Sequence, residues 1–214
     1  MGLLDRLASR RSETSVLARA ADCVDHSAFA TKALGQFLST LTAHETPVLL
    51  DLGPVIGTNL NFFGQELGCK IFVEDLFRDL DRFLRQGKAE EFAAFLEARF
   101  PQANGSVDGI LCWDIIDYLD KAAAQALATQ LTRVLRADGA LLGFFGTAQP
   151  RDARYTKYFI VDDSTLEYRP YPAVRPRQVV LLNRDILRLF SGLRVSDSFL
   201  LKNNLREILF RKPA

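Results

Sequence analysis

The chain has 214 residues, which is the length of one large domain rather than of two. Hydrophobic residues make up 48% of it, which excludes a disordered or a fibrous protein. The 27 Lys and Arg residues balance 26 Asp and Glu residues, and the net charge of +1 disfavours nucleic acid or an anionic membrane as the main partner.

The N-terminal segment, residues 1–45, is predicted to be a helical extension. Apolar side chains, including Phe29 and Leu41, recur there at helical spacing between residues 3 and 43, with two interruptions. We therefore expect two or three helices before the main domain, which is expected to cover residues 46–214.

Strand-like and helical stretches alternate after Pro47. The expected strands cover residues 48–52, 70–74, 108–113 and 140–145, and the expected helices cover residues 58–67, 78–99 and 121–136. Gly68 and the pair Asp138-Gly139 follow two of these helices and suit the left-handed backbone that ends a helix. Alternation of this kind predicts an α/β fold with a doubly wound, mostly parallel sheet.

An insertion is expected at about residues 147–177, where the alternation stops. Two short strand-like runs flank a polar turn there, and a loop rich in Pro and Arg follows. The segment gathers these aromatic and basic residues: Tyr155, Tyr158, Tyr168, Tyr171, Arg169, Arg175 and Arg177. Such a cluster suits an acidic or aromatic ligand, although a solvated insertion is the simpler interpretation.

The C-terminal segment is predicted to add a helix and two strands. The helix is expected over residues 184–191, with Asn183 as its N-cap. The strands are expected over residues 194–202 and 205–212, and Asn203-Asn204 between them tolerates positive φ. The chain is therefore expected to end in an antiparallel hairpin.

Cysteine usage indicates a reducing compartment. Cys23, Cys69 and Cys112 are widely spaced and form no C-x-x-C pair, which argues against a disulfide framework and against a zinc site. No apolar stretch is long enough to cross a bilayer, and charged residues occupy the N-terminus where a secretory signal would be apolar. We expect a cytoplasmic protein without a metal or a membrane span.

The turn after the first expected strand carries the most informative motif. Asp51, Gly53 and Gly57 lie in the run D-L-G-P-V-I-G, and Asn59 follows in the next helix. Ligands of doubly wound sheets bind at this edge, where glycine lets them approach the backbone. The spacing is not G-x-G-x-x-G, and Pro54 lacks an N–H, so NAD or FAD is disfavoured. The Asp51 carboxylate suits a ligand with an ammonium group, which indicates S-adenosylmethionine.

Acidic residues also end the second expected strand. Glu74 and Asp75 stand about as far from Gly53 as the acidic residue that reaches ribose hydroxyls in Rossmann-type sites. Asp75 is the preferred candidate and Glu74 the reserve. The alternative role of Asp75 is that of N-cap for the helix that follows.

Taken in order, these motifs resemble those of class I, Rossmann-like S-adenosylmethionine-dependent methyltransferases over residues 46–212. The first run matches the family motif (D/E)-x-G-x-G-x-G with Val55 in place of the middle Gly, and Glu74-Asp75 matches the acidic end of the second strand. Two later runs, 107–119 and 135–142, are similar to F-D-x-V…D-V-L-E-H-L and to L-(K/R)-P-G-G-x-L.

The resemblance implies methyl transfer from S-adenosylmethionine to an acceptor, which we expect to be a small molecule. Trp113 and Asp114 then join the expected cofactor site, although Trp113 is equally well explained as a core residue. Asp114, Asp117 and Tyr118 are the candidates for orienting the acceptor or accepting its proton. A homodimer is compatible with this interpretation.

A second hypothesis rests on two departures from the family pattern. Between Asp79 and Ala103, where the family has a third strand with an acidic residue near the adenine, the apolar residues from Leu80 to Leu96 have helical spacing. Pro54 and Val55 also stiffen a loop that is normally rich in glycine. These departures favour a catalytically inactive methyltransferase-fold protein that serves as a binding or scaffold module.

Overall fold

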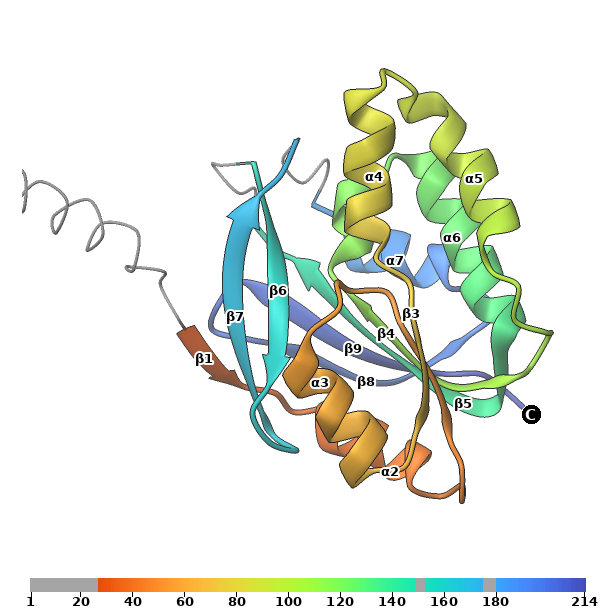
Figure 1. Ribbon diagram of the computed structural model, residues 1–214, viewed down its shortest axis with the longest axis vertical. Coiled ribbons are helices and arrows are strands. Elements are labelled where there is room, and N and C mark those ends of the chain that lie inside the picture. The colour runs from red at the N-terminus through yellow and green to blue at the C-terminus, as the bar shows by residue number, and fades with distance from the viewer. Residues whose placement is uncertain (1–26, 149–152, 175–179) are drawn as a thin grey trace, which may run out of the picture.

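The computed structural model describes residues 27–148, 153–174 and 180–214 (Figure 1). The helices expected before residue 27 lie outside the described residues. A six-stranded sheet has the order β3-β2-β4-β5-β9-β8, and a three-stranded sheet has the order β1-β7-β6. The larger sheet is formed by β2 (Val48–Asp51), β3 (Lys70–Val73), β4 (Val107–Trp113), β5 (Leu135–Gly146), β8 (Arg194–Leu200) and β9 (Leu205–Arg211).

The larger sheet confirms the predicted fold class. Strands β3, β2, β4 and β5 run parallel, and β9 lies antiparallel between β5 and β8. Every residue of β4 is buried, as expected for a parallel strand with helices on both faces. Asn204 has a φ of +59° in the turn between β8 and β9, so the predicted hairpin turn is also confirmed.

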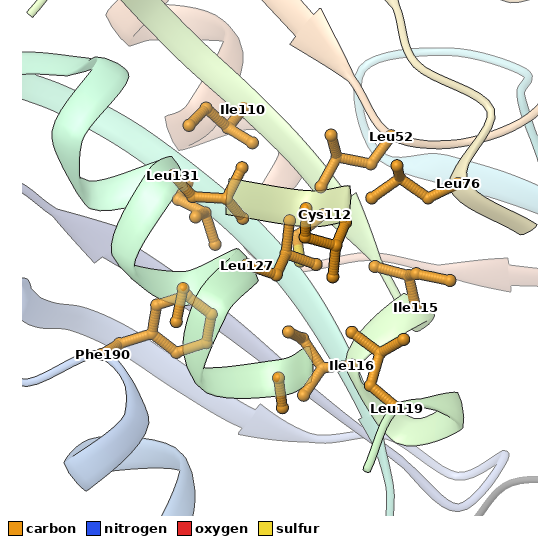
Figure 2. Close-up of a cluster of buried hydrophobic side chains, with 14 of the residues drawn as sticks. Leu52, Leu76, Ile110, Cys112, Ile115, Ile116, Leu119, Leu127, Leu131 and Phe190 are labelled. Carbon is orange, nitrogen blue, oxygen red and sulfur yellow. The ribbon is translucent and has the colours of Figure 1, made fainter. Parts of the chain in front are cut away.

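Helices cover both faces of this sheet. They are α2 (Leu34–Leu41), α3 (Gly57–Asn61), α4 (Leu76–Arg85), α5 (Phe92–Arg99), α6 (Lys121–Val134) and α7 (Asn183–Leu189), with a π-helical turn (Phe62–Glu66) and 3₁₀ turns at Ala89–Glu91 and Ile115–Tyr118. Side chains of α4 to α7 form one buried cluster with the sheet, and those of α2 form another. Figure 2 shows Leu127 and Leu131 of α6 beside Ile110 and Cys112 of β4.

Strand β3 is an edge strand, because helices occupy the chain between β3 and β4. Residues 74–106 are all described, and they contain α4 and α5 but no strand. Phe92 and Leu96 lie one helical turn apart and are both buried, which stabilises α5 against the sheet. The prediction of a helical stretch over residues 78–99 is confirmed, apart from a break near Gly87, whose φ is +68°.

The smaller sheet contains β1 (Ser27–Ala30), β6 (Arg154–Ile160) and β7 (Thr165–Pro172), all antiparallel. The prediction of a helix at Phe29 was wrong. Its ring packs edge-on against Phe144, with 6.0 Å between centroids, and Ser27–Ala30 pairs with β7, which holds the backbone extended. Asn183 as an N-cap was also wrong: the extended residue before the helix is Leu182, and no side-chain bond caps the helix.

Among the helices of the described segments, none is long and apolar enough to span a bilayer.

Candidate functional site

The carboxyl ends of β2, β3 and β4 bring the predicted residues together. Asp51 ends β2, Glu74 and Asp75 follow β3, and Trp113 ends β4. Parallel strands present their carboxyl ends at one edge of the sheet, which is where doubly wound folds bind ligands. We call this edge the crevice.

Asp51 is bonded to its own chain. The indole Nε1 of Trp113 donates a hydrogen bond to Asp51 Oδ1 at 2.6 Å, and the Gly53 backbone N–H donates to the same oxygen at 2.9 Å. The Trp113 backbone has a φ of +48°, a left-handed value that is uncommon outside glycine. Only 4% of Asp51 is exposed.

The indole of Trp113 also explains the glycine at position 53. A Cβ added to Gly53 would lie 2.8 Å from Trp113 Nε1 and 2.9 Å from its Cδ1. The close approach that the sequence suggested for a ligand is thus made by Trp113. Gly57 has no such neighbour, since a Cβ there would meet nothing within 4 Å.

Aromatic rings extend from Trp113 into the insertion. The indole stacks on the Tyr158 ring of β6, with centroids 5.1 Å apart and planes 7° apart. Phe144 of β5 stacks on both, at 6.1 Å from Trp113 and 5.2 Å from Tyr158. The insertion therefore lies over the crevice and supplies part of its filling.

Asn59 attaches β6 to the crevice. Its Nδ2 donates to the Tyr158 carbonyl at 2.9 Å, and the Ile160 N–H donates to its Oδ1 at 2.9 Å. The side chain thereby pairs with the backbone of β6 as a neighbouring strand would. Only 2% of Asn59 is exposed, so both ends of its amide are committed inside the protein.

Burial raises the pKa of Asp51 to about 6, above its ordinary value of 3.8. The hydrogen bonds from Gly53 and Trp113 oppose this rise, and the negative charge of Asp75 adds to it. Burial disfavours the ionised form because the low-dielectric interior solvates a carboxylate poorly.

Glu74 and Asp75 also have internal partners. The guanidinium of Arg99, on α5, lies 2.5 Å from Glu74 Oε2. Burial raises the pKa of Glu74, and the charge of Arg99 lowers it. Asp75 Oδ1 accepts a hydrogen bond from the Arg78 N–H at 3.0 Å, so Asp75 is the N-cap of α4. This is the alternative role that the sequence offered.

Substitutions at Asp75 separate capping from ligand binding. We expect Asp75→Ala to lower the free energy of unfolding by about 0.5–2 kcal/mol, because the cap is lost, and Asp75→Asn to leave it nearly unchanged, because Asn also caps helices well. Urea denaturation measures both. Equal stability of the two variants would contradict the capping role. If Asp75 instead binds ribose hydroxyls, both variants are expected to lose nucleoside binding.

The candidate catalytic residues lie inside the protein. Asp114 is fully buried, and Asp117 Oδ2 accepts a hydrogen bond from the Gly146 N–H of β5 at 2.6 Å. The Tyr118 hydroxyl donates to the Arg154 carbonyl of β6 at 2.7 Å. Asp117 and Tyr118 thus join β5 and β6 to the turn after β4. Burial and the charges of Asp114 and Asp117 raise the pKa of the Cys112 thiol far above its ordinary value, so this cysteine is unreactive.

The sequence analysis missed Arg99 and Phe144 as parts of the site, and it assigned Tyr158 to the aromatic and basic cluster of the insertion rather than to the crevice. Their contacts join residues that are far apart along the chain, so no local sequence pattern predicts these contacts. Within the three described segments, no group of three or more His, Cys, Asp or Glu residues is placed to hold a metal ion.

No protein-family model matches the chain, and no curated protein matches it in sequence. Solved structures match it in fold. TehB from Haemophilus influenzae aligns over 83% of this chain with a TM-score of 0.50 and 13% identity, and the chain spans 62% of that protein. A SAM-dependent methyltransferase from Aquifex aeolicus aligns over 84% of this chain and 92% of its own length, with a TM-score of 0.47 and 14% identity.

The fold is that of the class I, Rossmann-like S-adenosylmethionine-dependent methyltransferases. Another structure of similar fold, the [4+2]-cyclase SpnF, has a TM-score of 0.51 and 11% identity over 85% of this chain and 80% of its own. Its name describes a cyclisation, so the methyltransferase fold does not by itself determine the reaction. The function therefore has to be inferred from the residues of the crevice.

Proposed function

We propose that this chain is a non-catalytic protein of the methyltransferase fold that acts as a binding module. The observation that carries the proposal is the position of Trp113, whose indole lies against Gly53 and donates to Asp51. These two residues are the ones that the first motif assigns to S-adenosylmethionine. The side chain of Trp113 stands where the cofactor would have to approach.

The energy needed to displace Trp113 is a large fraction of the roughly 8 kcal/mol with which a micromolar cofactor binds. Breaking its hydrogen bond to a carboxylate costs about 1.5–3 kcal/mol, and losing its stacking on Tyr158 and Phe144 costs about 0.5–1.5 kcal/mol for each ring. A ligand that displaces the indole therefore loses affinity by roughly 10²- to 10⁴-fold. A micromolar cofactor would become a ligand of about 0.1–10 mM.

The other acidic residues support the same proposal. Glu74 is paired with Arg99, which comes from the helix that stands in place of the family's third strand. Asp75 caps α4. Asp51, Glu74 and Asp75 thus each have a structural partner within the chain.

Methyl transfer from S-adenosylmethionine to a small molecule is the second candidate. Buried carboxylates at the crevice favour it, because burying them costs stability and perturbed acids gather at functional sites. These are Asp51, Glu74, Asp114 and Asp117. In this candidate Asp51, Gly53, Gly57, Asn59, Glu74, Asp75, Trp113 and Asp114 would hold the cofactor, and Asp114, Asp117 and Tyr118 would position the acceptor. Either function is proposed for a cytoplasmic protein, as a monomer or a homodimer.

Titration with S-adenosylmethionine and with its demethylated product separates the two candidates. We expect any binding to have a dissociation constant of about 0.1–10 mM, the range reached when the indole must be displaced. Trp113 is the only tryptophan, so its fluorescence reports on the crevice in the same titration. A dissociation constant below about 100 µM together with a fluorescence change would overturn the proposal.

Two variants test the role of the indole directly. Trp113→Ala removes both the hydrogen bond and the stacking, and we expect it to bind S-adenosylmethionine at least tenfold more tightly than the wild type. Trp113→Phe keeps a ring against Tyr158 and is expected to bind S-adenosylmethionine as weakly as the wild type does. Thermal unfolding checks that both variants are folded.

A further inference from the structure

A groove that adjoins the crevice at Asp75 lies between α4 and the smaller sheet. It has a volume of about 560 Å³, within the range of roughly 300–1,000 Å³ that is usual for small-molecule sites. Its lining residues are Asp75, Phe77, Arg78, Asp81, Arg82, Arg85 and Gln86 of α4 and its ends, and Tyr155 of β6. We call it the α4 groove.

Three guanidiniums face this groove from one side of α4. Arg78, Arg82 and Arg85 follow each other at the four- and three-residue spacing that keeps side chains on one helix face. Arg82 is engaged, since it lies 2.9 Å from Asp79 Oδ1 and over the ring of Phe83. Across the described parts of the chain, Arg78 and Arg85 form no ion pair, so both are available to a ligand.

The two carboxylates of the groove are partly committed. Asp75 Oδ1 caps α4, and Asp81 Oδ1 accepts a hydrogen bond from the Val174 N–H at 3.3 Å. Arg82 is paired with Asp79, so Arg78 and Arg85 are the guanidiniums that a ligand in the groove can reach. An anionic group placed beside these two side chains is attracted by both.

Aromatic rings form the rest of the lining. Phe77 stacks on Tyr155 with centroids 5.1 Å apart, and Tyr155 stacks on Tyr171 at 5.7 Å. The ammonium of Lys157 lies 4.1 Å from the Tyr171 ring centroid, which adds a further cation beside this stack. Burial raises the pKa of Tyr155, with the charges of Asp75 and Asp81 adding to it, so its hydroxyl stays protonated and can donate to a ligand at neutral pH.

We propose that the α4 groove binds a small anion built on a planar ring, of the chemical class of a nucleotide or an aryl phosphate. Arg78 and Arg85 hold the anionic group, because guanidiniums match phosphate oxygens in geometry and charge. The ligand's ring lies against the accessible edge of Tyr155, because Phe77 and Tyr171 already stack on the Tyr155 ring. S-adenosylmethionine offers these guanidiniums a single carboxylate, whereas a phosphate group offers more charge and more acceptor oxygens. The inference rests on the proposed function, since it names the ligand of the binding module.

Titration with ATP in the absence of Mg²⁺ tests the proposal, with tripolyphosphate and adenosine as the two halves of the probe. We expect ATP to bind the wild type and each half to bind at least tenfold more weakly. The double variant Arg78→Ala/Arg85→Ala is expected to lose at least tenfold in ATP affinity. Arg188→Ala, an exposed arginine on α7, is the matched control and is expected to bind as the wild type does.

Each other outcome overturns a stated part of the proposal. Unchanged ATP affinity in the double arginine variant would show that Arg78 and Arg85 do not bind the anionic group. Equal affinity for ATP and tripolyphosphate would show that the ligand's ring does not contribute to binding. Unchanged ATP affinity in Tyr155→Ala would show the same, and Tyr155→Phe, which retains the aromatic ring, is the control for that variant. Thermal unfolding of each variant confirms that it is folded.

The outcome for the groove is independent of that for the crevice. Trp113→Ala is expected to leave ATP affinity unchanged, because Trp113 does not line the α4 groove. Binding of S-adenosylmethionine by the wild type would overturn the proposed function and leave the ATP result readable. Absence of ATP binding would overturn the proposal for the α4 groove and leave the proposed function untouched.

Discussion

Replacing Asn59 by alanine is expected to lower the free energy of unfolding by about 2–5 kcal/mol. The substitution leaves the Tyr158 carbonyl and the Ile160 N–H without their partner, and each buried polar group left unsatisfied costs about 1–3 kcal/mol. Urea denaturation followed by circular dichroism measures the loss. Because β6 carries the ring that stacks on Trp113, the variant is also expected to shift tryptophan emission to longer wavelength.

Asn61→Ala is the matched control for this prediction. Asn61 lies on the same short helix but is exposed, so its replacement is expected to change stability by no more than about 0.5 kcal/mol. A loss below about 1 kcal/mol for Asn59→Ala would show that the side chain does not hold β6 against the crevice.

Replacing Asp51 by asparagine is expected to stabilise the protein at pH 7. The pKa of Asp51 rises from 3.8 in the unfolded chain to about 6 in the folded protein. Between these values the folded state binds more protons than the unfolded state, so stability falls as pH rises through this window. Each unit of difference is worth about 1.4 kcal/mol, so the carboxylate destabilises the folded state at pH 7 by up to about 3 kcal/mol.

The asparagine keeps the contacts that hold Trp113. Both hydrogen bonds to Asp51 end on Oδ1, and an asparagine oxygen accepts them in the same way. In Asp51→Asn, the free energy of unfolding measured by urea denaturation from pH 3.5 to 8 is expected to fall less steeply with rising pH, because the Asp51 carboxylate no longer contributes to that fall. Asp163→Asn, at an exposed turn, is the control and is expected to retain the slope. A variant less stable than the wild type at pH 7 would contradict a destabilising carboxylate.

The sequence predicted the elements of the main sheet because their signals are local. Buried β-rich runs, helical spacing and left-handed stops such as Gly68 and Asp138 are read from neighbouring residues, and both positions have positive φ. The helical segment between Asp79 and Ala103 was predicted in the same way, and it replaces the family's third strand. Ser27–Ala30 was mispredicted because a distant pairing with Thr165–Tyr168 overrides its helical spacing.

The sequence by itself determined that acids and glycines stand at the ends of adjacent parallel strands, since strand order and motif spacing follow from local pattern. Only the tertiary structure decided what those residues contact. Asp51 and Trp113 are 62 positions apart, and Asn59 and Tyr158 are 99 apart. Whether such a side chain faces a ligand or another side chain depends on how distant segments pack and exclude water, and one-dimensional spacing contains no measure of that packing.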